Sequence, residues 1–402
     1  MQKHILVISQ YFYPEQFRIN DICCEWIKRG YKVTVVTGIP NYPQGKFYEG
    51  YDYTHKRFEE WNGIKIIRMA IKPRKTGSVN LIKNYFSFVY QGNKWVRKHD
   101  LKADVVFVYE VSPMTQALVG VKYSKKHHVG CNLYVTDLWP ENVELITGIH
   151  NKLFLAPIGW MVDYVYKHCN WIFTSSKSFV NKIASRGVSK DKLVYWPQYA
   201  EDFYSKVESS EVTEIPNDGN TNITFAGNIG YAQGLQVLIG SAKLLQKKKT
   251  KVRFNIIGNG RYLDEMKLLV LQENLSTIFN FIDRQPAEKI PYFFAASDAA
   301  LITLEKSEVF AMTIPSKTQS CMACGMPIIA SVDGEVQTII NDAKCGFASD
   351  AGDEKALAKN IERFCGLSDD EKENMAERSL EYYKNNFERK MLLDKMEEFI
   401  NE

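Results

Sequence analysis

Residues 223–245 read ITFAGNIGYAQGLQVLIGSAKLL, and this stretch decides the fold class. Ile223–Ala226 is a short apolar run, which predicts a strand. The apolar spacing in Leu235–Lys247 predicts an amphipathic helix. Between the two stand Gly227, Gly230 and Gly234. A strand that enters a helix through a glycine-rich turn is the repeating unit of parallel α/β sheets, so the stretch indicates an α/β domain.

The same alternation of strand and helix runs through both halves of the chain. In the first half, Ile5–Ile8 and Val105–Tyr109 predict strands and Asp21–Lys28 predicts a helix. In the second half, Val252–Ile257 predicts a strand and Asp369–Glu402 a long final helical tract. Because 402 residues exceed the usual size of one hydrophobic core, we expect two doubly wound, mostly parallel-sheet α/β domains. Ligands of such sheets bind at the carboxyl ends of the strands, so the predicted site is the cleft between the domains.

The domain limits follow from one change of pattern. The segment 196–222 is polar and irregular and contains two prolines, which is typical of a linker. We therefore predict an N-terminal domain over residues 1–197, a linker over 198–222 and a C-terminal domain over 223–380.

The composition narrows the class of protein. With 45% hydrophobic and 24% charged residues the chain is an ordinary globular protein, and a net charge of +4 does not indicate a nucleic-acid partner. Ile5–Ile8 is too short for a signal peptide, and no apolar run approaches the ~18 residues of a membrane span. We expect a cytoplasmic protein with reduced thiols. Cys321 and Cys324 form an isolated CxxC pair, which we interpret as buried core.

The stretch 313–331, TIPSKTQSCMACGMPIIAS, puts a lysine in an unfavourable place. Ser316 is the predicted N-cap of a short helix that ends just before Gly325. Lys317 then lies in the first turn, where the helix dipole disfavours a cation by up to about 1 kcal/mol. A bound diphosphate would remove this conflict by placing negative charge between the ammonium group and the helix N-terminus. The alternative is an exposed lysine that reaches solvent.

A second glycine turn supports a phosphate site. The stretch 256–266, IIGNGRYLDEM, follows the next predicted strand and carries Gly258, Gly260 and Arg261. Glycines at such turns let backbone N–H groups approach a phosphate, although each turn could also be a plain tight connection. Because both turns and Lys317 belong to the same edge of one domain, we predict a diphosphate pocket there.

Three segments carry a resemblance to one family. They are the strand–GNxG–xxQGL–helix opening at 223–245, PSKxxxxMAxGxPIIAS at 315–331 and DLWPE at 137–141. They resemble bacterial glycosyltransferases of family 4, and more narrowly the WbuB/WcaI-like enzymes of surface-polysaccharide assembly. The resemblance implies the GT-B fold, in which two Rossmann-like domains face an interdomain cleft. It also implies a nucleotide-sugar donor on the C-terminal domain, an acceptor on the N-terminal domain and a C-terminal helix, residues 381–402, that packs back on the first domain.

The chain departs from the family at the predicted donor site. The Arg and Lys that many members carry in the glycine-rich loop are replaced by Asn228 and Gln233, and the family's E-x7-E positions fall near Met312 and Ser320. The nearest acids are Glu305, Glu308 and Glu335. Lys317 is then expected to carry more of the diphosphate charge, together with Arg261 or Arg284, and residues 283–285 resemble the loop that contacts the nucleobase. The expected donor-binding residues are Gly227, Asn228, Gly230, Gln233, Gly258, Gly260, Arg261, Arg284, Ser316, Lys317 and Glu335.

Polar residues after the predicted strands of the first domain are candidates for acceptor binding. Glu15, Arg18 and Asn20 follow the first strand, and Asn20 is the expected cap of the helix Asp21–Lys28. Glu110 follows the strand 105–109. These residues are candidate sugar contacts, and solvated loop positions are the alternative.

The stretch 133–142, LYVTDLWPEN, places two carboxylates and an aromatic residue after another strand. Asp137 and Glu141 flank Trp139, which suits acceptor binding or general base catalysis. The catalytic candidates are therefore Asp137, Glu141 and Lys317, and Trp139 is an acceptor candidate. Alternatively, Asp137 caps a turn and Trp139 packs in the core.

The tract 63–102 is basic and aromatic. It contains ten Lys or Arg residues, one acid, Asp100, and the aromatic residues Tyr85, Phe86, Phe88, Tyr90 and Trp95. This combination suits the anionic surface of the inner membrane or a lipid-linked diphosphate. The alternative is a solvated face whose aromatic residues lie in the core.

The resulting hypothesis is transfer of a sugar from a nucleoside-diphosphate sugar, expected to be UDP-linked, to a growing, lipid-linked surface polysaccharide. We expect retention of configuration and charge stabilisation by Lys317, with no metal and no other cofactor. The alternatives are a UDP-sugar 2-epimerase of the same fold and a catalytically silent nucleotide-sugar-binding protein.

Overall fold

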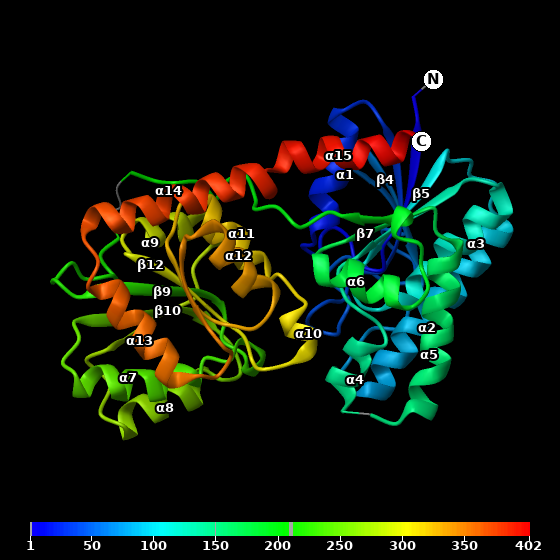
Figure 1. Cartoon of the computed structure of the whole chain (residues 1–402). Coiled ribbons are helices and arrows are strands. Elements are labelled where there is room, and N and C mark those ends of the chain that lie inside the picture. The colour runs from blue at the N-terminus through cyan, green and yellow to red at the C-terminus, as the bar shows by residue number, and fades with distance from the viewer. Residues whose placement is uncertain (1, 149, 209–211) are drawn as a thin grey trace. The chain divides into compact units, whose positions relative to one another are not determined.

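A computed structural model describes residues 2–148, 150–208 and 212–402 (Figure 1). The chain forms two compact units, Met1–Trp196 with Lys395–Glu402, and Pro197–Asp394. The stretch predicted as a linker, 198–222, is part of the second unit, and its residues 209–211 lie outside the described residues.

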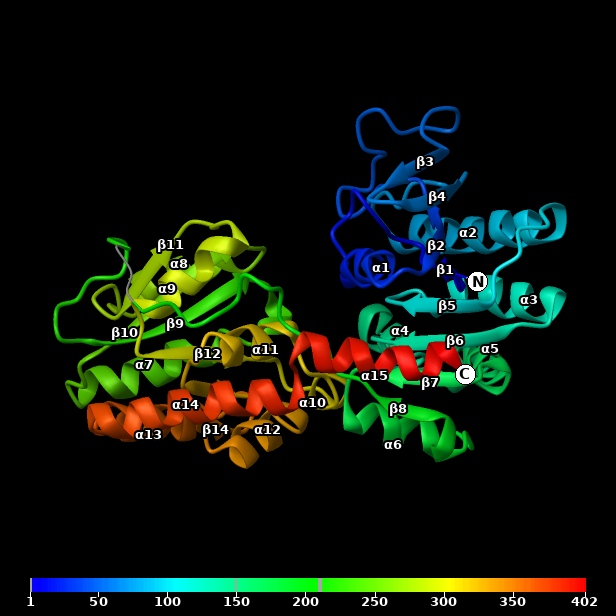
Figure 2. The same cartoon turned by 90° about the horizontal axis from the view of Figure 1, so that it is seen from above.

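Unit 1 is built on a sheet that has eight strands within the described residues, in the order β3-β4-β2-β1-β5-β6-β7-β8 (Figure 2). All its pairs are parallel except the edge pair of β3 with β4. The strands are β1 His4–Ile8, β2 Lys32–Gly38, β3 Phe58–Trp61, β4 Ile64–Met69, β5 Val105–Glu110, β6 Gly130–Val135, β7 Trp171–Thr174 and β8 Leu193–Tyr195. The helices are α1 Arg18–Lys28, α2 Ser78–Lys98, α3 Ala117–His127, α4 Glu141–Thr147, α5 Lys152–His168 and α6 Lys177–Ser185.

Unit 2 is built on a parallel sheet in the order β11-β10-β9-β12-β13-β14. Counted from its first strand this is the order 3-2-1-4-5-6 of doubly wound nucleotide-binding sheets, which reverses between β9 and β12. The strands are β9 Thr221–Asn228, β10 Val252–Asn259, β11 Phe279–Ile282, β12 Ala299–Thr303, β13 Ile328–Ser331 and β14 Gly346–Ser349. The helices are α7 Val237–Lys247, α8 Leu263–Gln272, α9 Ile290–Ala295, α10 Glu308–Ala311, α11 Ser316–Ala323, α12 Glu335–Ala343, α13 Glu354–Cys365 and α14 Asp369–Asn386. The prediction of two parallel-sheet α/β domains is confirmed.

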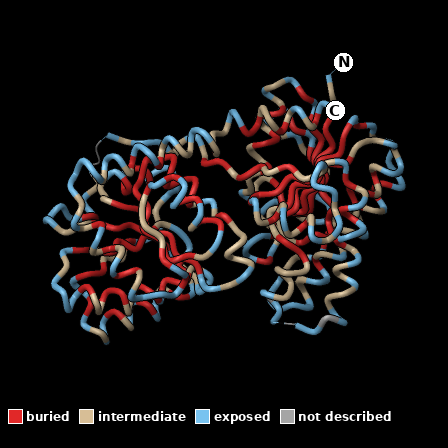
Figure 3. The backbone as a smooth tube through the Cα atoms, in the orientation of Figure 1, coloured by how far each residue is buried: buried red, intermediate tan, exposed pale blue. Residues whose placement is uncertain are grey.

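Two apolar layers cover the faces of the unit 2 sheet, and alternation along the strands assigns residues to them. In β12, Ala299 and Leu301 belong to one layer, and Ala300 and Ile302 belong to the other. Strands buried on both faces read as continuous apolar runs, which is why the sequence signalled them clearly. Figure 3 shows the strands buried and the outer faces of many helices exposed.

The predicted helix limits were wrong at three places. Pro315, not Ser316, precedes the first residue of α11, and no side chain caps that helix. Helix α1 begins at Arg18 instead of Asp21, with Phe17 at the cap, because the Asn20 side chain donates to the Glu15 carbonyl oxygen from inside the first turn. The final tract divides into α14 and α15, Arg389–Asn401, at the buried residue Phe387.

The last residues of α15 belong to unit 1. Glu397 accepts a hydrogen bond from Arg29 at 2.6 Å, and the Phe399 ring lies 4.8 Å from the Trp171 ring. The end of the chain is therefore fixed to the unit that its beginning forms.

The two glycine turns of unit 2 pack backbone against backbone. A Cβ atom added at Gly258, whose φ is +144°, would lie 1.9 Å from the Gly227 carbonyl oxygen. The Ile229 amide donates to the Asn259 carbonyl at 2.8 Å and ties the two turns together. Glycine is thus required at 258 both for its dihedral angle and for space.

We predict that Gly258→Ala lowers the free energy of unfolding by about 2–4 kcal/mol, because overpacking and a strained φ each cost about 1–3 kcal/mol. Gly219→Ala is the matched control, since Gly219 also has a positive φ but no atom lies within 4 Å of its added Cβ. Urea unfolding measures both. Equal losses in the two variants would contradict the close packing of the turns.

Candidate nucleotide-binding site

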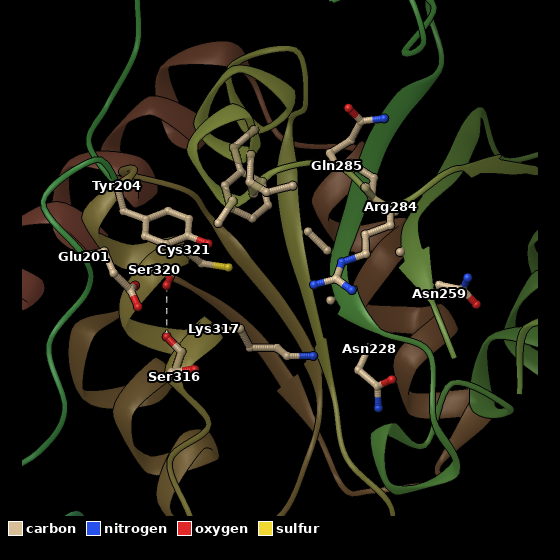
Figure 4. Close-up of a pocket in the computed structure, with 17 residues that line it drawn as sticks. Glu201, Tyr204, Asn228, Asn259, Arg284, Gln285, Ser316, Lys317, Ser320 and Cys321 are labelled. Atoms are coloured by element: carbon tan, nitrogen blue, oxygen red, sulfur yellow. Dashed lines mark hydrogen bonds between the residues drawn. The ribbon is translucent and has the colours of Figure 1, made fainter. Parts of the chain in front are cut away.

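A cavity of about 500 Å³ opens at the carboxyl edge of the unit 2 sheet (Figure 4). Its lining comes from the ends of β9 and β10, the loop after β11, the first turns of α11, and the segment that leads into unit 2. The lining residues are Glu201, Tyr204, Ala226, Gly227, Asn228, Ile257, Gly258, Asn259, Arg284, Gln285, Ala287, Ile290, Phe294, Ser316, Lys317, Ser320 and Cys321. The volume and the mixed lining suit a small organic ligand.

Lys317 is the second residue of α11, and its ammonium group is buried in surroundings that solvate a charge less well than water does. Its ammonium nitrogen lies 4.1 Å from the centroid of the buried Phe225 ring and donates to Oε1 of Gln233. A Cβ atom at residue 227 would lie 3.3 Å from that nitrogen, so glycine there leaves room for the ammonium group. Burial lowers the pKa of Lys317 to about 8.

The N-terminus of α11 adds to the electrostatic strain on this lysine. The residue before the helix is Pro315, so no side-chain oxygen accepts a bond from the first amides. A cation here meets the positive end of the helix dipole. An anionic ligand would be attracted by both the helix end and the ammonium group, and would relieve their repulsion.

A second cation faces the same cavity. Figure 4 shows the Arg284 guanidinium group pointing into the pocket on the side of Asn228, toward the end of the Lys317 side chain. Arg284 and Gln285 follow β11, where the nucleobase loop was expected, and Ile257, Ile290 and Phe294 form an apolar wall nearby. The cavity thus offers charge for an anion and an apolar surface for a ring.

The remaining predicted donor residues divide into two groups. Gln233 contacts Lys317, and Gly230 and Gly260 shape the two turns, although they do not line the cavity. Arg261 is exposed and Glu335 is largely buried at the start of α12, and neither is among the lining residues. Sequence reasoning missed Glu201 and Tyr204, which lie in the stretch predicted as a linker.

Unit 1 gathers charged residues at the carboxyl ends of β1, β5 and β6. Arg18, Asp137 and Glu110 all act on the pKa of the buried Tyr109, so these three ionisable side chains lie near the end of β5. Burial, reinforced by the charge of Asp137, raises the pKa of Glu110 well above its usual range. Burial therefore favours the protonated form of Glu110, whose side chain is fully buried.

Three other unit 1 candidates have clear structural partners. An Asp137 carboxylate oxygen accepts the Ser112 amide at 2.7 Å, and the indole of Trp139, which is 8% exposed, donates to the Ser112 hydroxyl at 3.0 Å. The Glu141 carboxylate lies 3.2 Å from the Lys182 ammonium nitrogen. Asp137 and Trp139 thus fasten the loops after β5 and β6 to each other.

Glu15 is buried inside a loop cluster. Its carboxylate accepts the amides of Asn41 and Tyr42 at 2.7 Å each and that of Phe12 at 3.3 Å. Burial nevertheless raises its pKa to about 7, because the amide bonds only partly offset desolvation. These bonds occupy both oxygens, so the Glu15 side chain holds the loop after β2 against the loop after β1.

Residues 207–382 match the family described as Glycosyl transferases group 1. The chain carries a glycosyl transferases group 1 domain. The cavity of unit 2, with Lys317 and both glycine turns, lies within this domain except for Glu201 and Tyr204. The resemblance seen in the sequence is therefore confirmed.

The chain is similar in sequence to bacterial glycosyltransferases. The chain is 27% identical over 243 residues to the probable glycosyltransferase WbjE of Pseudomonas aeruginosa, covering 58% of this chain and 60% of that protein. It is 23% identical over 319 residues to the putative colanic acid biosynthesis glycosyl transferase WcaI of Escherichia coli, covering 75% of each. The structure of Anabaena Alr3699/HepE in complex with UDP and glucose is similar over 100% of both chains, with a TM-score of 0.69 and 14% identity. That structural likeness shows the fold.

We predict that nucleoside-diphosphate affinity falls with pH through the ionisation of Lys317. An anion raises the pKa of a nearby ammonium group, so binding takes up a proton above pH 8. With UDP as the probe, the dissociation constant should be insensitive to this group below pH 8 and rise roughly tenfold between pH 8 and 9.5. Isothermal titration calorimetry in buffers of different ionisation enthalpy measures both the affinity and the proton uptake.

Lys317→Gln supplies the control, because glutamine does not titrate. Its affinity should be weaker and flat over the same pH interval. Parallel curves for the two proteins would show that Lys317 does not bind the ligand's charge.

Proposed function

We propose that the chain is a glycosyltransferase that moves a sugar from a UDP-sugar to a growing, lipid-linked surface polysaccharide, with retention of configuration. The observation that carries the proposal is the desolvated Lys317 ammonium group at an uncapped helix end, beside two glycine turns in a cavity of nucleotide size. The relatives support the polysaccharide assignment, since WcaI is named for colanic acid biosynthesis. The complex of HepE with UDP supports the choice of base.

The proposed chemistry places the developing charge beside Lys317. The bond from the sugar's anomeric carbon to the diphosphate oxygen breaks, the acceptor oxygen bonds to that carbon, and the acceptor hydroxyl transfers its proton to the departing diphosphate. Negative charge builds on the departing UDP, where Lys317, Arg284 and the amides of the glycine turns would stabilise it. We propose that these groups do so without a metal. Among the described residues, no three His, Cys, Asp or Glu side chains are grouped so as to hold a metal ion.

We assign acceptor binding to the charged end of β5 and β6 in unit 1. Arg18 and Asp137 are half-buried there, close to Tyr109, and can contact sugar hydroxyls from two sides. Asp137 keeps one oxygen bonded to the Ser112 amide, which fixes the orientation of its carboxylate. We propose Asp137 as the acceptor-binding carboxylate in preference to Glu141, because the charge of Glu141 is paired with Lys182.

We further propose that α2 brings unit 1 to an anionic membrane surface. No helix among the described residues is long and apolar enough to cross a membrane. The outward face of α2 nevertheless exposes large apolar side chains at helical spacing, Val79, Ile82, Phe86 and Tyr90, each more than half exposed. The same helix carries Lys83, Lys94, Arg97 and Lys98 and no acid. Apolar residues interleaved with cations match the chemistry of an anionic lipid surface.

The predicted basic and aromatic tract is thus divided by the fold. Arg68 is buried and paired with Glu59, and Phe88 and Trp95 lie in the core. Helix α5, which packs against α3 as α2 does, adds Leu153, Phe154 and Trp160, each at least 70% exposed. The exposed part of both helices, and not the whole tract 63–102, is the surface that we assign to lipid.

We predict that Lys317→Ala lowers the turnover number by about 10² or more, because one lost charge-stabilising donor costs that much in related oxyanion sites. The assay follows UDP release and formation of a larger glycolipid from UDP-sugars and a lipid-linked acceptor, with and without EDTA. Lys355→Ala on the exposed face of α13 is the control and should match the wild type.

The outcomes separate the alternatives. Undiminished turnover of Lys317→Ala would remove the lysine from the mechanism, and loss of turnover in EDTA would overturn metal independence. UDP release with no acceptor-linked product would favour an epimerase. UDP binding without any turnover would favour a silent binding protein.

We predict that Ile82→Ser with Phe86→Ser abolishes binding of the protein to vesicles that contain anionic phospholipid, while catalysis on a water-soluble acceptor persists. The Leu268→Ser and Leu271→Ser pair on α8 is matched, since both leucines are also more than half exposed. Co-sedimentation at low and high salt is the measurement, and salt should weaken wild-type binding. Equal binding by both double variants would exclude α2 as the lipid contact.

A further inference from the structure

The cavity of unit 2 has one wall that the proposed diphosphate chemistry does not use. Glu201, Tyr204, Ser316 and Ser320 form this wall, and Figure 4 shows them across the pocket from Asn228 and Arg284. Among the described residues that line the cavity, Glu201 is the only acid. Since a carboxylate repels phosphate, Glu201 must face a different part of the ligand.

The fold holds Glu201 at the cavity although it lies far from the glycosyltransferase motifs in sequence. Its carbonyl oxygen accepts the Tyr204 amide at 2.8 Å, and Tyr204 packs against the apolar layer that includes Cys321 and Met322 of α11. Two further contacts fix the segment to unit 2, Asp202 with Arg389 at 3.5 Å and Lys206 with Glu373 at 2.6 Å. The carboxylate therefore belongs to a built wall and not to a loose connection.

The helix beside Glu201, α11, lines the cavity with small polar side chains and supplies no acid to it. Ser316 and Ser320 stand one turn apart on α11, and the Ser320 hydroxyl donates to the Ser316 carbonyl at 3.2 Å. Figure 4 shows the Glu201 carboxylate on the side of these two serines. Small side chains on α11 thus put the only negative charge of the cavity on the other segment.

The chemistry of a carboxylate selects its partner. An ionised carboxylate only accepts hydrogen bonds, and it has two oxygens that can bind two neighbouring hydroxyl donors. Within a nucleoside diphosphate, the ribose has such a pair at its 2′ and 3′ positions, between the base and the diphosphate. The cations of the cavity suit the diphosphate, and Ile257, Ile290 and Phe294 suit the base.

We infer that Glu201 binds the ribose hydroxyls of the nucleotide and makes the site selective for ribonucleotides. The inference rests on the proposed function, because it takes a nucleoside diphosphate as the ligand. It assigns a ligand contact to the segment before β9.

The test measures the binding of UDP, 2′-deoxy-UDP and 3′-deoxy-UDP by calorimetry. The wild type should bind each deoxy analogue roughly tenfold or more weakly than UDP, because charge-assisted hydrogen bonds are among the stronger ones. Glu201→Ala should weaken UDP binding by a similar factor, and its affinities for the three nucleotides should agree within about twofold. A double-mutant cycle over the Glu201 side chain and the ribose hydroxyl expresses this result as a coupling energy. Glu208→Gln, an exposed acid of the same segment outside the cavity, should behave as the wild type.

The outcomes distinguish the two levels of the argument. No binding of UDP to the wild type would overturn the proposed function and the inference together. Tight UDP binding with no discrimination against the deoxy nucleotides would overturn the inference alone, even if the Glu201 variant failed to fold. An equal loss of affinity for all three nucleotides in Glu201→Ala would also overturn the inference. So would a Glu201→Ala effect on the binding of UDP-sugars but not of UDP, because it would place the contact at the transferred sugar.

Discussion

The proposed ligand site of unit 2 depends on the buried ammonium group of Lys317. It lies over the Phe225 ring, bonds to Gln233 and stands at the positive end of α11, so desolvation and the helix dipole both oppose its charge. Burial accordingly lowers its pKa to about 8. A site that destabilises its own cation in the absence of ligand gains affinity for an anion that restores the missing solvation.

The glycine turns make this arrangement sterically possible. Gly227 leaves the room that the ammonium group occupies, and Gly258 lets the second turn lie against the carbonyl of the first. The glycine-rich loop of this chain carries the neutral residues Asn228 and Gln233. The Gln233 amide oxygen accepts a hydrogen bond from Lys317, so it orients the ammonium group without cancelling its charge.

Unit 1 is also a mostly parallel α/β sheet, and its acidic residues have different roles from the cations of unit 2. Its strands end in acids, but the acids are mostly committed to structure, as Glu15 is to three backbone amides and Glu141 to Lys182. Asp137, which accepts the Ser112 amide, and Arg18 lie at the edge to which we assign acceptor binding. Large apolar side chains are exposed on α2 and α5, and α2 also carries cations.

The sequence by itself determined the two parallel-sheet domains, the glycine turns and the unusual lysine, because periodicity, turn chemistry and helix position are local properties. Six lining residues were also predicted, because Gly227, Asn228, Gly258 and Arg284 follow strands and Ser316 and Lys317 begin a helix in the same domain. The tertiary structure decided the rest. Glu201 and Tyr204 lie more than a hundred residues before Lys317 in a stretch without a motif. Tertiary contacts bring them to the cavity, namely the packing of Tyr204 on an apolar layer and the ion pairs of Asp202 and Lys206. Burial likewise separated Arg68 from the exposed cations of its tract, because a residue's solvent exposure depends on neighbours that its own segment does not contain.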